Sequence, residues 1–386
     1  MHNERALGLG MLAAGILLAV ATWLYWTSVV DPVRPPYPGL VAPTPSVNAS
    51  ETASAAPAEP EEPPWTEEDD AMATTLAEQR KSMLRKMKLR LRLDDATIER
   101  VRQIVEAAPW LGQGNPAAVE HPMTRAQCRE IREAAGLKPQ WNQHCDAKNM
   151  VPLWNREAGE TEADARVCID QFEFPDIACE YPVTWVTARD AALLCQAIGK
   201  RLCDAHEWEG ACAGSLRPVE QEYAFGKERV QMRYLHNLDR DEVWAYGPTK
   251  DHSRCATGSH KSRACTEIGW RQCGSNTYPA GAFPGCVSSF GVYDLHGNAA
   301  EHMNLPLKPE ELASRGGMGQ TEMKGSWFIF STYEAHTDDC RWRAPDWHAT
   351  RVMDVNSHHN YHLGFRCCKN LGEPMAPPSP TGEAGP

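Results

Sequence analysis

The sequence predicts an irregular, loop-rich α+β domain, held together by disulfides, behind an N-terminal transmembrane helix. All 14 cysteines lie at or beyond Cys128 and show no repeated CxxC spacing, so they favour disulfides over a zinc module. The same part of the chain is rich in Gly, Pro, Asn and aromatic residues without sustained alternation, which predicts many loops and few long strands. A long uncharged run near the N-terminus precedes both features.

That run, residues 6–30, reads ALGLGMLAAGILLAVATWLYWTSVV. At about 1.5 Å per residue, a helix of this length crosses a hydrocarbon core. A cleavable signal sequence is the alternative, although the run is long for one and lacks an obvious cleavage site. Because Arg5 precedes the run, we expect a single-pass membrane protein whose remainder is extracytoplasmic, either periplasmic or extracellular. Such a compartment is oxidising and permits disulfides.

Composition divides the rest of the chain. Residues 31–66 form a Pro/Ala/Glu-rich linker, residues 67–150 a helical and partly basic segment, residues 167–370 the main domain, and residues 371–386 a disordered tail. The net charge of -12 argues against nucleic acid as a partner, because an acidic field repels phosphate.

Periodicity and capping residues predict the helices. Met83, Met87 and Leu91 share one helical stripe, and Asp94 can cap a second helix. The basic stretch RKSMLRKMKLRLR is interpreted as a solvated helix face; a surface for anionic lipid or a partner is the alternative.

Three further helices are predicted from their caps. Thr124 and Gln127 form a capping box for a short helix ending near Gly136. In the main domain we expect helices over residues 188–198 and 205–213, each followed by a glycine.

Four segments of the main domain resemble the formylglycine-generating enzyme family, also called the sulfatase-modifying factor domain. They read, in order, YPVTWVTARDAALLCQAIGKRLCDAHEWEGACAG, AGAFPGCVSSFGVYDLHGNAAEH, KGSWF and HLGFRCC. The resemblance covers about half of the chain. It implies a compact fold related to C-type lectins, with little regular structure, calcium in loops and disulfides between distant segments.

The expected disulfides come from two sources. The resemblance implies that Cys195 pairs with Cys367 and that Cys212 pairs with Cys340. Proximity along the chain favours Cys128 with Cys145 and Cys168 with Cys179. The sequence leaves open the connectivity of the other six, which are Cys203, Cys255, Cys265, Cys273, Cys286 and Cys368.

Calcium is the cofactor that the resemblance implies. Carboxylates and backbone carbonyls suit this hard cation. The family pattern corresponds to side-chain oxygens of Asp294 and Glu301 and to the carbonyls of Gly297 and Ala299. A weaker second calcium set would use Asn237 and Leu238.

The oxidase chemistry of the family is not expected here. The family binds copper through two cysteines just after the glycine-serine-aromatic strand, since a soft metal needs thiolates. Those positions fall on Ile329 and Glu334, in a stretch whose residues resemble a packed strand. Iron is not expected either, because the related iron enzymes need a helical-bundle motif that is missing here. His358, His359 and His362 are interpreted as exposed loop residues.

The sequence therefore predicts a binding or scaffold module that engages an envelope protein or polysaccharide. Trp327, Trp342 and Trp347 are candidate contact residues, with burial in the core as the alternative. The competing hypothesis is a metal-dependent oxidoreductase, with altered metal ligation, that acts on an unknown protein or small molecule.

Overall fold

The computed structural model describes residues 62–138, 141–266, 269–345 and 349–372. They lie in the compact unit Gly39–Pro386. The predicted transmembrane segment 6–30, nearly all of the linker, and the tail beyond residue 372 lie outside the described residues. Over the described ranges, no helix combines the length and the apolar character needed to span a membrane.

The helical segment that was predicted from residue 67 is confirmed, and local capping explains its boundaries. It contains α2 (Glu67–Asp70), α3 (Leu76–Arg90), α4 (Asp95–Ala107) and α5 (Arg125–Ala134). In α4, the Asp94 side chain accepts the backbone N–H of Thr97 at 2.7 Å, as the sequence predicts. In α5, Thr124 and Gln127 form the predicted capping box.

The described part of the main domain contains four further helices, of which α6 and α7 have capping residues. They are α6 (Ala188–Ala197), α7 (Ala205–Ala213), α8 (Val219–Glu222) and α9 (Arg229–Asp239). Short 3-10 turns connect other segments, namely η1 (Arg156–Ala158), η2 (Glu162–Asp164), η3 (His252–Arg254), η4 (Pro309–Glu311) and η5 (Ala313–Arg315). Thr187 caps α6, and Gly214 ends α7 in the left-handed conformation.

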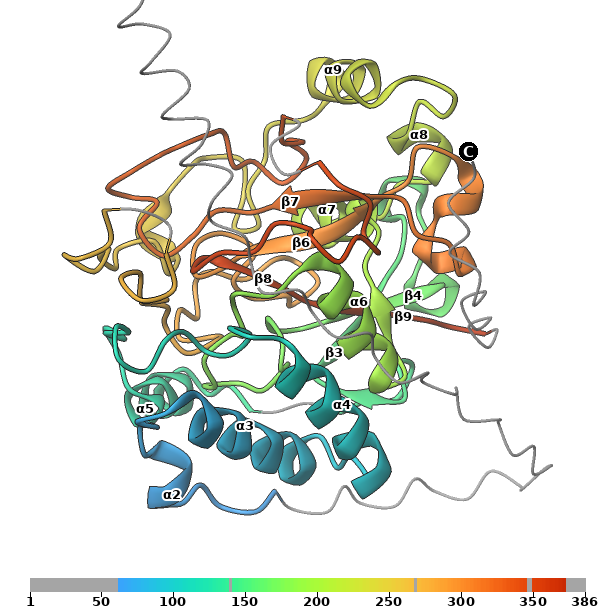
Figure 1. The fold of residues 1–386 in the computed structure, drawn as a ribbon. Helices are drawn as coiled ribbons and strands as arrows, with labels where there is room; N and C mark the ends of the chain where they lie inside the picture. The colour runs from blue at the N-terminus through green and yellow to red at the C-terminus, as the bar shows by residue number, and fades with distance from the viewer. Residues whose placement is uncertain (1–61, 139–140, 267–268, 346–348, 373–386) are drawn as a thin grey trace, which may run out of the picture. The chain divides into compact units, whose positions relative to one another are not determined.

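Two small sheets meet at the C-terminal strands (Figure 1). The first is antiparallel with the order β3-β4-β9-β5: β3 (Met150–Leu153), β4 (Val167–Asp170), β9 (Cys367–Asn370), β5 (Arg201–Leu202). The second has the order β7-β6-β8: β7 (Gln320–Lys324), β6 (Ala300–Leu305), β8 (Leu363–Phe365). A hairpin pairs β1 (Trp141–Asn142) with β2 (Ala147–Lys148). The short strands and long connections confirm the mixed α+β class.

The interpretation of the basic stretch as a solvated helix face holds only in part, because Lys81, Lys88 and Arg92 are exposed whereas two other basic residues are not. Lys86 and Arg90 are buried. Lys86 forms an ion pair with Glu180 of the main domain, and Arg90 forms one with Asp69 at 3.3 Å. Lys86 thus joins the helical segment to the main domain, whereas Arg90 ties α3 to α2.

The prediction of disulfides is confirmed, because all 14 cysteines form seven bridges. Two are the bridges implied by the resemblance, Cys195–Cys367 and Cys212–Cys340. The remaining six cysteines pair as Cys203–Cys368, Cys255–Cys286 and Cys265–Cys273.

The two pairings based on chain proximity are wrong. Cys128 pairs with Cys179, and Cys145 pairs with Cys168. The reason is the packing of α5, which places Cys128 in a cluster with Cys179 and Ala282. Cys145 lies in another cluster with Met150 and Cys168. Neighbours along the chain therefore belong to different parts of the core.

Candidate functional site

The stretch that follows β7 is a buried turn. Gly325 adopts a positive φ of 74°, and the backbone N–H groups of Phe330 and Thr332 then donate to the carbonyls of Trp327 and Ile329 at 2.9 and 3.0 Å. The prediction of burial is confirmed for residues 326–330, whereas residues 331–334 are exposed. The packed strand is wrong, because the glycine redirects the chain as soon as β7 ends at Lys324.

Ile329 and Glu334 have different surroundings. Ile329 is 6% exposed and belongs to an aromatic core cluster. Glu334 is exposed and forms an ion pair with Lys250. One position thus lies in the core and the other at the surface.

The core cluster around Ile329, called here the aromatic cluster, consists of buried rings, a disulfide and two half-buried tryptophans. Its members are Trp110, Trp185, Cys265, Trp270, Cys273, Trp327, Phe328, Ile329, Phe330 and Tyr361. The Nε1 atoms of Trp185 and Trp327 are buried and have no hydrogen-bond partner within the described part of the chain. An unsatisfied buried donor costs about 1–3 kcal/mol, so an acceptor at these two atoms would be favourable.

The three C-terminal histidines border this cluster. His362 stacks on Trp327 with ring centroids 4.6 Å apart, and His359 lies 5.2 Å from the Trp110 ring. His358 contacts Asn360 at 2.9 Å. All three histidines are half-buried, so their interpretation as exposed loop residues is wrong.

The other tryptophans of the predicted contact surface differ in environment. Trp342 is half-buried and stacks on His336 with centroids 4.7 Å apart. Trp347 lies outside the described residues.

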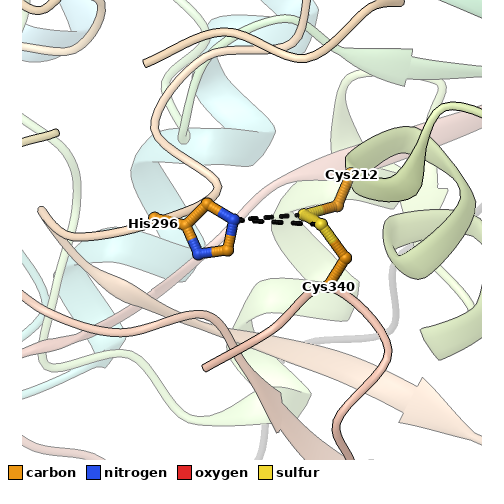
Figure 2. Close-up of side chains that lie close together, drawn as sticks. All are labelled: Cys212, His296 and Cys340. Carbon is orange, nitrogen blue, oxygen red and sulfur yellow. Dashed lines mark hydrogen bonds between the residues drawn. A yellow bond between two sulfur atoms is a disulfide. The ribbon is translucent and has the colours of Figure 1, made fainter. Parts of the chain in front are cut away.

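A histidine that the sequence analysis did not single out lies against the Cys212–Cys340 disulfide. Figure 2 shows the His296 ring pointing at the two sulfur atoms, with Nε2 at 3.4 Å from Cys212 and 3.8 Å from Cys340. The same Nε2 accepts the backbone N–H of Ala245 at 3.0 Å. Since both sulfurs are bonded to each other, they supply no thiolates for a metal.

Asp338 connects this histidine to the turn. Its carboxylate accepts the Ser326 hydroxyl at 2.9 Å, contacts His252 Nε2 at 3.1 Å and lies 3.7 Å from His296 Nδ1. Burial raises the pKa of Asp338, but the hydrogen bond with His252 and the proximity of His296 outweigh burial and hold that pKa below its usual range. Asp338 was missed in the sequence, although it stands two residues before Cys340.

The predicted calcium residues surround a buried group of carboxylates. Asp294 accepts the backbone N–H of Gly281 at 2.5 Å through Oδ2, while its buried Oδ1 has no hydrogen-bond partner. Glu301 binds Arg366 at 2.6 and 2.7 Å. The additional carboxylate is Glu173, which the sequence analysis missed and which accepts the backbone N–H of Ala299 at 2.8 Å.

This set has the charge that suits a hard cation, although its ligand atoms do not all lie within 4.8 Å of one another. Burial raises the pKa of Asp294 to about 6 and, together with repulsion from Asp294 and Glu301, raises the pKa of Glu173. Arg366 forms an ion pair with Glu301, and the charges of Arg366 and Arg132 act to lower the pKa of Asp294, but burial outweighs them, so a divalent ion would reduce the remaining repulsion. Asp294 Oδ1 and the remaining lone pair of Glu301 Oε1 are the side-chain donors that could hold it.

The weaker second calcium set receives no such support. The Asn237 side chain donates to the carbonyl of Arg343 and accepts its N–H, both at 2.9 Å. Leu238 is 70% exposed. Asn237 thus holds the chain near Cys340.

Comparisons with known proteins agree with the resemblance. Residues 119–371 match one protein family, the sulfatase-modifying factor enzyme 1-like domain; this match begins ahead of residue 167 and includes α5. No curated protein matches the chain. Among solved structures the chain is similar to one titled "Crystal Structure of CarF", with a TM-score of 0.32 and 13% identity, covering 58% of this chain and 97% of that chain.

Proposed function

Since this chain belongs to the family of sulfatase-modifying factor enzyme 1-like domains, we propose that it is a divergent member that acts as a binding or scaffold module and not as an oxidase. The observation that carries this proposal is the state of the cysteines. All 14 are bonded in pairs, so none is left as a thiolate for copper. Ile329 and Glu334, at the positions of the family's cysteine pair, offer no soft ligand.

The aromatic cluster supports a binding role. Trp185 and Trp327 each offer a buried indole N–H without an acceptor, and half-buried Trp110 and Trp270 lie beside them. Flat apolar rings with such donors suit a ligand that has hydroxyl or carbonyl acceptors. We propose an envelope polysaccharide as this ligand, with a segment of an envelope protein as the alternative.

The proposal also includes a bound calcium ion and attachment of the chain to a membrane. A calcium ion held by Asp294 and Glu301 would fix the loop that leads into β6. Seven disulfides suit an oxidising compartment. We therefore place the domain outside the cytoplasm, attached to the membrane by residues 6–30.

Metal analysis separates this proposal from the oxidoreductase hypothesis. We expect the purified chain to contain calcium without stoichiometric copper or iron, and to consume no oxygen in the presence of a thiol substrate. Stoichiometric copper or iron together with oxygen consumption would contradict the proposal.

Calcium removal tests the ion site itself. Chelation should lower the melting temperature of the wild-type chain, because the buried carboxylates then repel one another. Asp294→Ala should reduce the difference in melting temperature with and without calcium, whereas Asp239→Ala, at the end of α9, should leave that difference unchanged. An equal calcium effect in the wild type and in Asp294→Ala would exclude the assignment.

A further inference from the structure

A pocket of about 190 Å³ lies at the junction of the helical segment and the main domain. Its walls include Arg90 at the end of α3, Arg129 and Arg132 of α5, and Lys148 of β2. None of its lining residues belongs to the aromatic cluster or to the predicted calcium residues. The pocket is therefore distinct from the site described above.

The wall carries more positive than negative charge. Four cations line it, against the two carboxylates of Glu62 and Glu133. Three of the cations have acidic partners: Arg90 pairs with Asp69, Arg129 with Asp70, and Lys148 with Glu62. Arg132 makes no ion pair with any described residue.

Arg132 is the cation that most needs an anion. It is 6% exposed, donates to the carbonyl of Gly281 at 2.9 Å, and lies over the rings of Phe172 and Tyr293 at 5.0 and 4.9 Å. Burial lowers the pKa of its guanidinium, because its charged form is poorly solvated. The carbonyl, the two rings and the charge of Asp294, which makes no ion pair with Arg132, compensate only in part, whereas a carboxylate could bind the guanidinium with two parallel hydrogen bonds.

Two buried polar atoms of the wall, one on a guanidinium and one on a neutral amide, further restrict the chemistry of the ligand. Arg90 Nε and Asn149 Oδ1 are buried and have no hydrogen-bond partner among the described residues. One is a donor and the other an acceptor, so a matching ligand has an acceptor for the first and a hydroxyl or amino group for the second. The volume is below that of a drug-sized site, which favours a small molecule.

We propose that this pocket binds a small carboxylate that also carries a hydroxyl or amino donor. The carboxylate lies against Arg132, with Arg129 and Lys148 supplying a favourable field, and the donor meets Asn149. This site is independent of the aromatic cluster and of the oxidase question.

Calorimetry on the full 386-residue chain tests the proposal with malate, succinate and succinamide. Malate carries two carboxylates and a hydroxyl, succinate lacks the hydroxyl, and succinamide lacks the charge. We expect malate to bind more tightly than succinate, and succinamide to show no binding. Arg132→Gln should weaken malate binding by at least about tenfold, and Arg132→Lys, which keeps the charge, by less.

Matched variants keep the test decisive. Arg254→Gln removes an exposed arginine outside the pocket and should leave malate affinity unchanged. If Arg132→Gln lowers the melting temperature too far for titration, Arg129→Gln, whose side chain is 25% exposed, should still show weaker binding in a folded chain. Three results would overturn the proposal. They are failure of malate to bind, equal malate affinity in the wild type and the pocket variants, and binding of inorganic phosphate without binding of malate.

Discussion

Glu180 shows how a single residue joins the helical segment to the main domain. Its carboxylate is fully buried and faces Lys86 of α3 and Arg125 of α5. Burial raises the pKa of Glu180, but attraction to Arg125 and Lys86 outweighs it and lowers that pKa to about 2. Burial lowers the pKa of Lys86, and attraction to Glu180 opposes this effect. With two cations against one carboxylate, the ionised form of Glu180 is strongly favoured.

This shift predicts a loss of stability in acid. The folded pKa of Glu180 lies below its ordinary value of 4.5, so its contribution is fully present above pH 4.5 and is lost as the pH falls towards 2. The shift corresponds to up to about 3 kcal/mol. Glu180→Gln should destabilise the chain by about 3 kcal/mol at pH 7, because Lys86 stays buried with less compensation.

Denaturant unfolding at several pH values measures this effect. Between pH 5 and pH 2, the free energy of unfolding should fall less for Glu180→Gln than for the wild type. Glu310→Gln, which changes an exposed carboxyl, serves as the control and should follow the wild type. Parallel pH profiles for Glu180→Gln and the wild type would show that the buried ion pairs have no such role.

At the scale of elements, the connection from residue 294 to β6 contains three residues with positive φ. Asp294, Gly297 and Asn298 all have positive φ, between 52° and 79°. The Asn298 N–H donates to the Ala256 carbonyl at 2.8 Å, and the Gly297 N–H donates to the Ser326 hydroxyl at 2.9 Å. This segment thereby links the buried carboxylates around Asp294 to the turn after β7.

Gly297→Ala should destabilise the chain for two reasons. A Cβ at this position would lie 2.6 Å from the carbonyl oxygen of Ala256, and alanine disfavours a φ of 79°. We expect a loss of about 2 kcal/mol or more in the free energy of unfolding. Gly285→Ala is the matched control, since its Cβ would meet nothing within 4 Å. Equal unfolding free energies for the two variants would be inconsistent with this reading of the segment.

For the molecule as a whole, two adjacent bridges tie the C-terminal strand to the region around α6. Cys195–Cys367 and Cys203–Cys368 span 172 and 165 residues. Cys195 is close in sequence to Cys203, and Cys367 is next to Cys368. Either bridge alone therefore already closes the long loop. The second bridge then closes only a short one.

The two bridges should therefore contribute non-additively. In the chain-entropy model, replacing one pair by alanines costs about 2–3 kcal/mol, and replacing both pairs costs about 1–2 kcal/mol more than the sum of the two single losses. Chemical denaturation of the two paired variants and their combination measures this. Replacement of Cys265–Cys273, which spans 8 residues, is the control and should add independently to either pair. Simple additivity for the two adjacent bridges would contradict the argument.

The sequence by itself determined the features that depend on neighbours within a few residues. Asp94, Thr124 and Thr187 cap their helices as predicted, and Gly214 ends α7, because each cap satisfies backbone groups one turn away. It also determined the α+β class and the family, since four segments in order carry the resemblance. The positions of Ile329 and Glu334 followed from that resemblance.

Only the tertiary structure decided what depends on contacts between distant residues. It paired Cys128 with Cys179 and not with Cys145, and it buried Lys86 beside Glu180. It also placed His296 against the Cys212–Cys340 bridge and Arg132 in the wall of a pocket. The physical reason is that local periodicity fixes which side of an element a residue lies on, whereas the packing of elements against one another decides which partner it meets there.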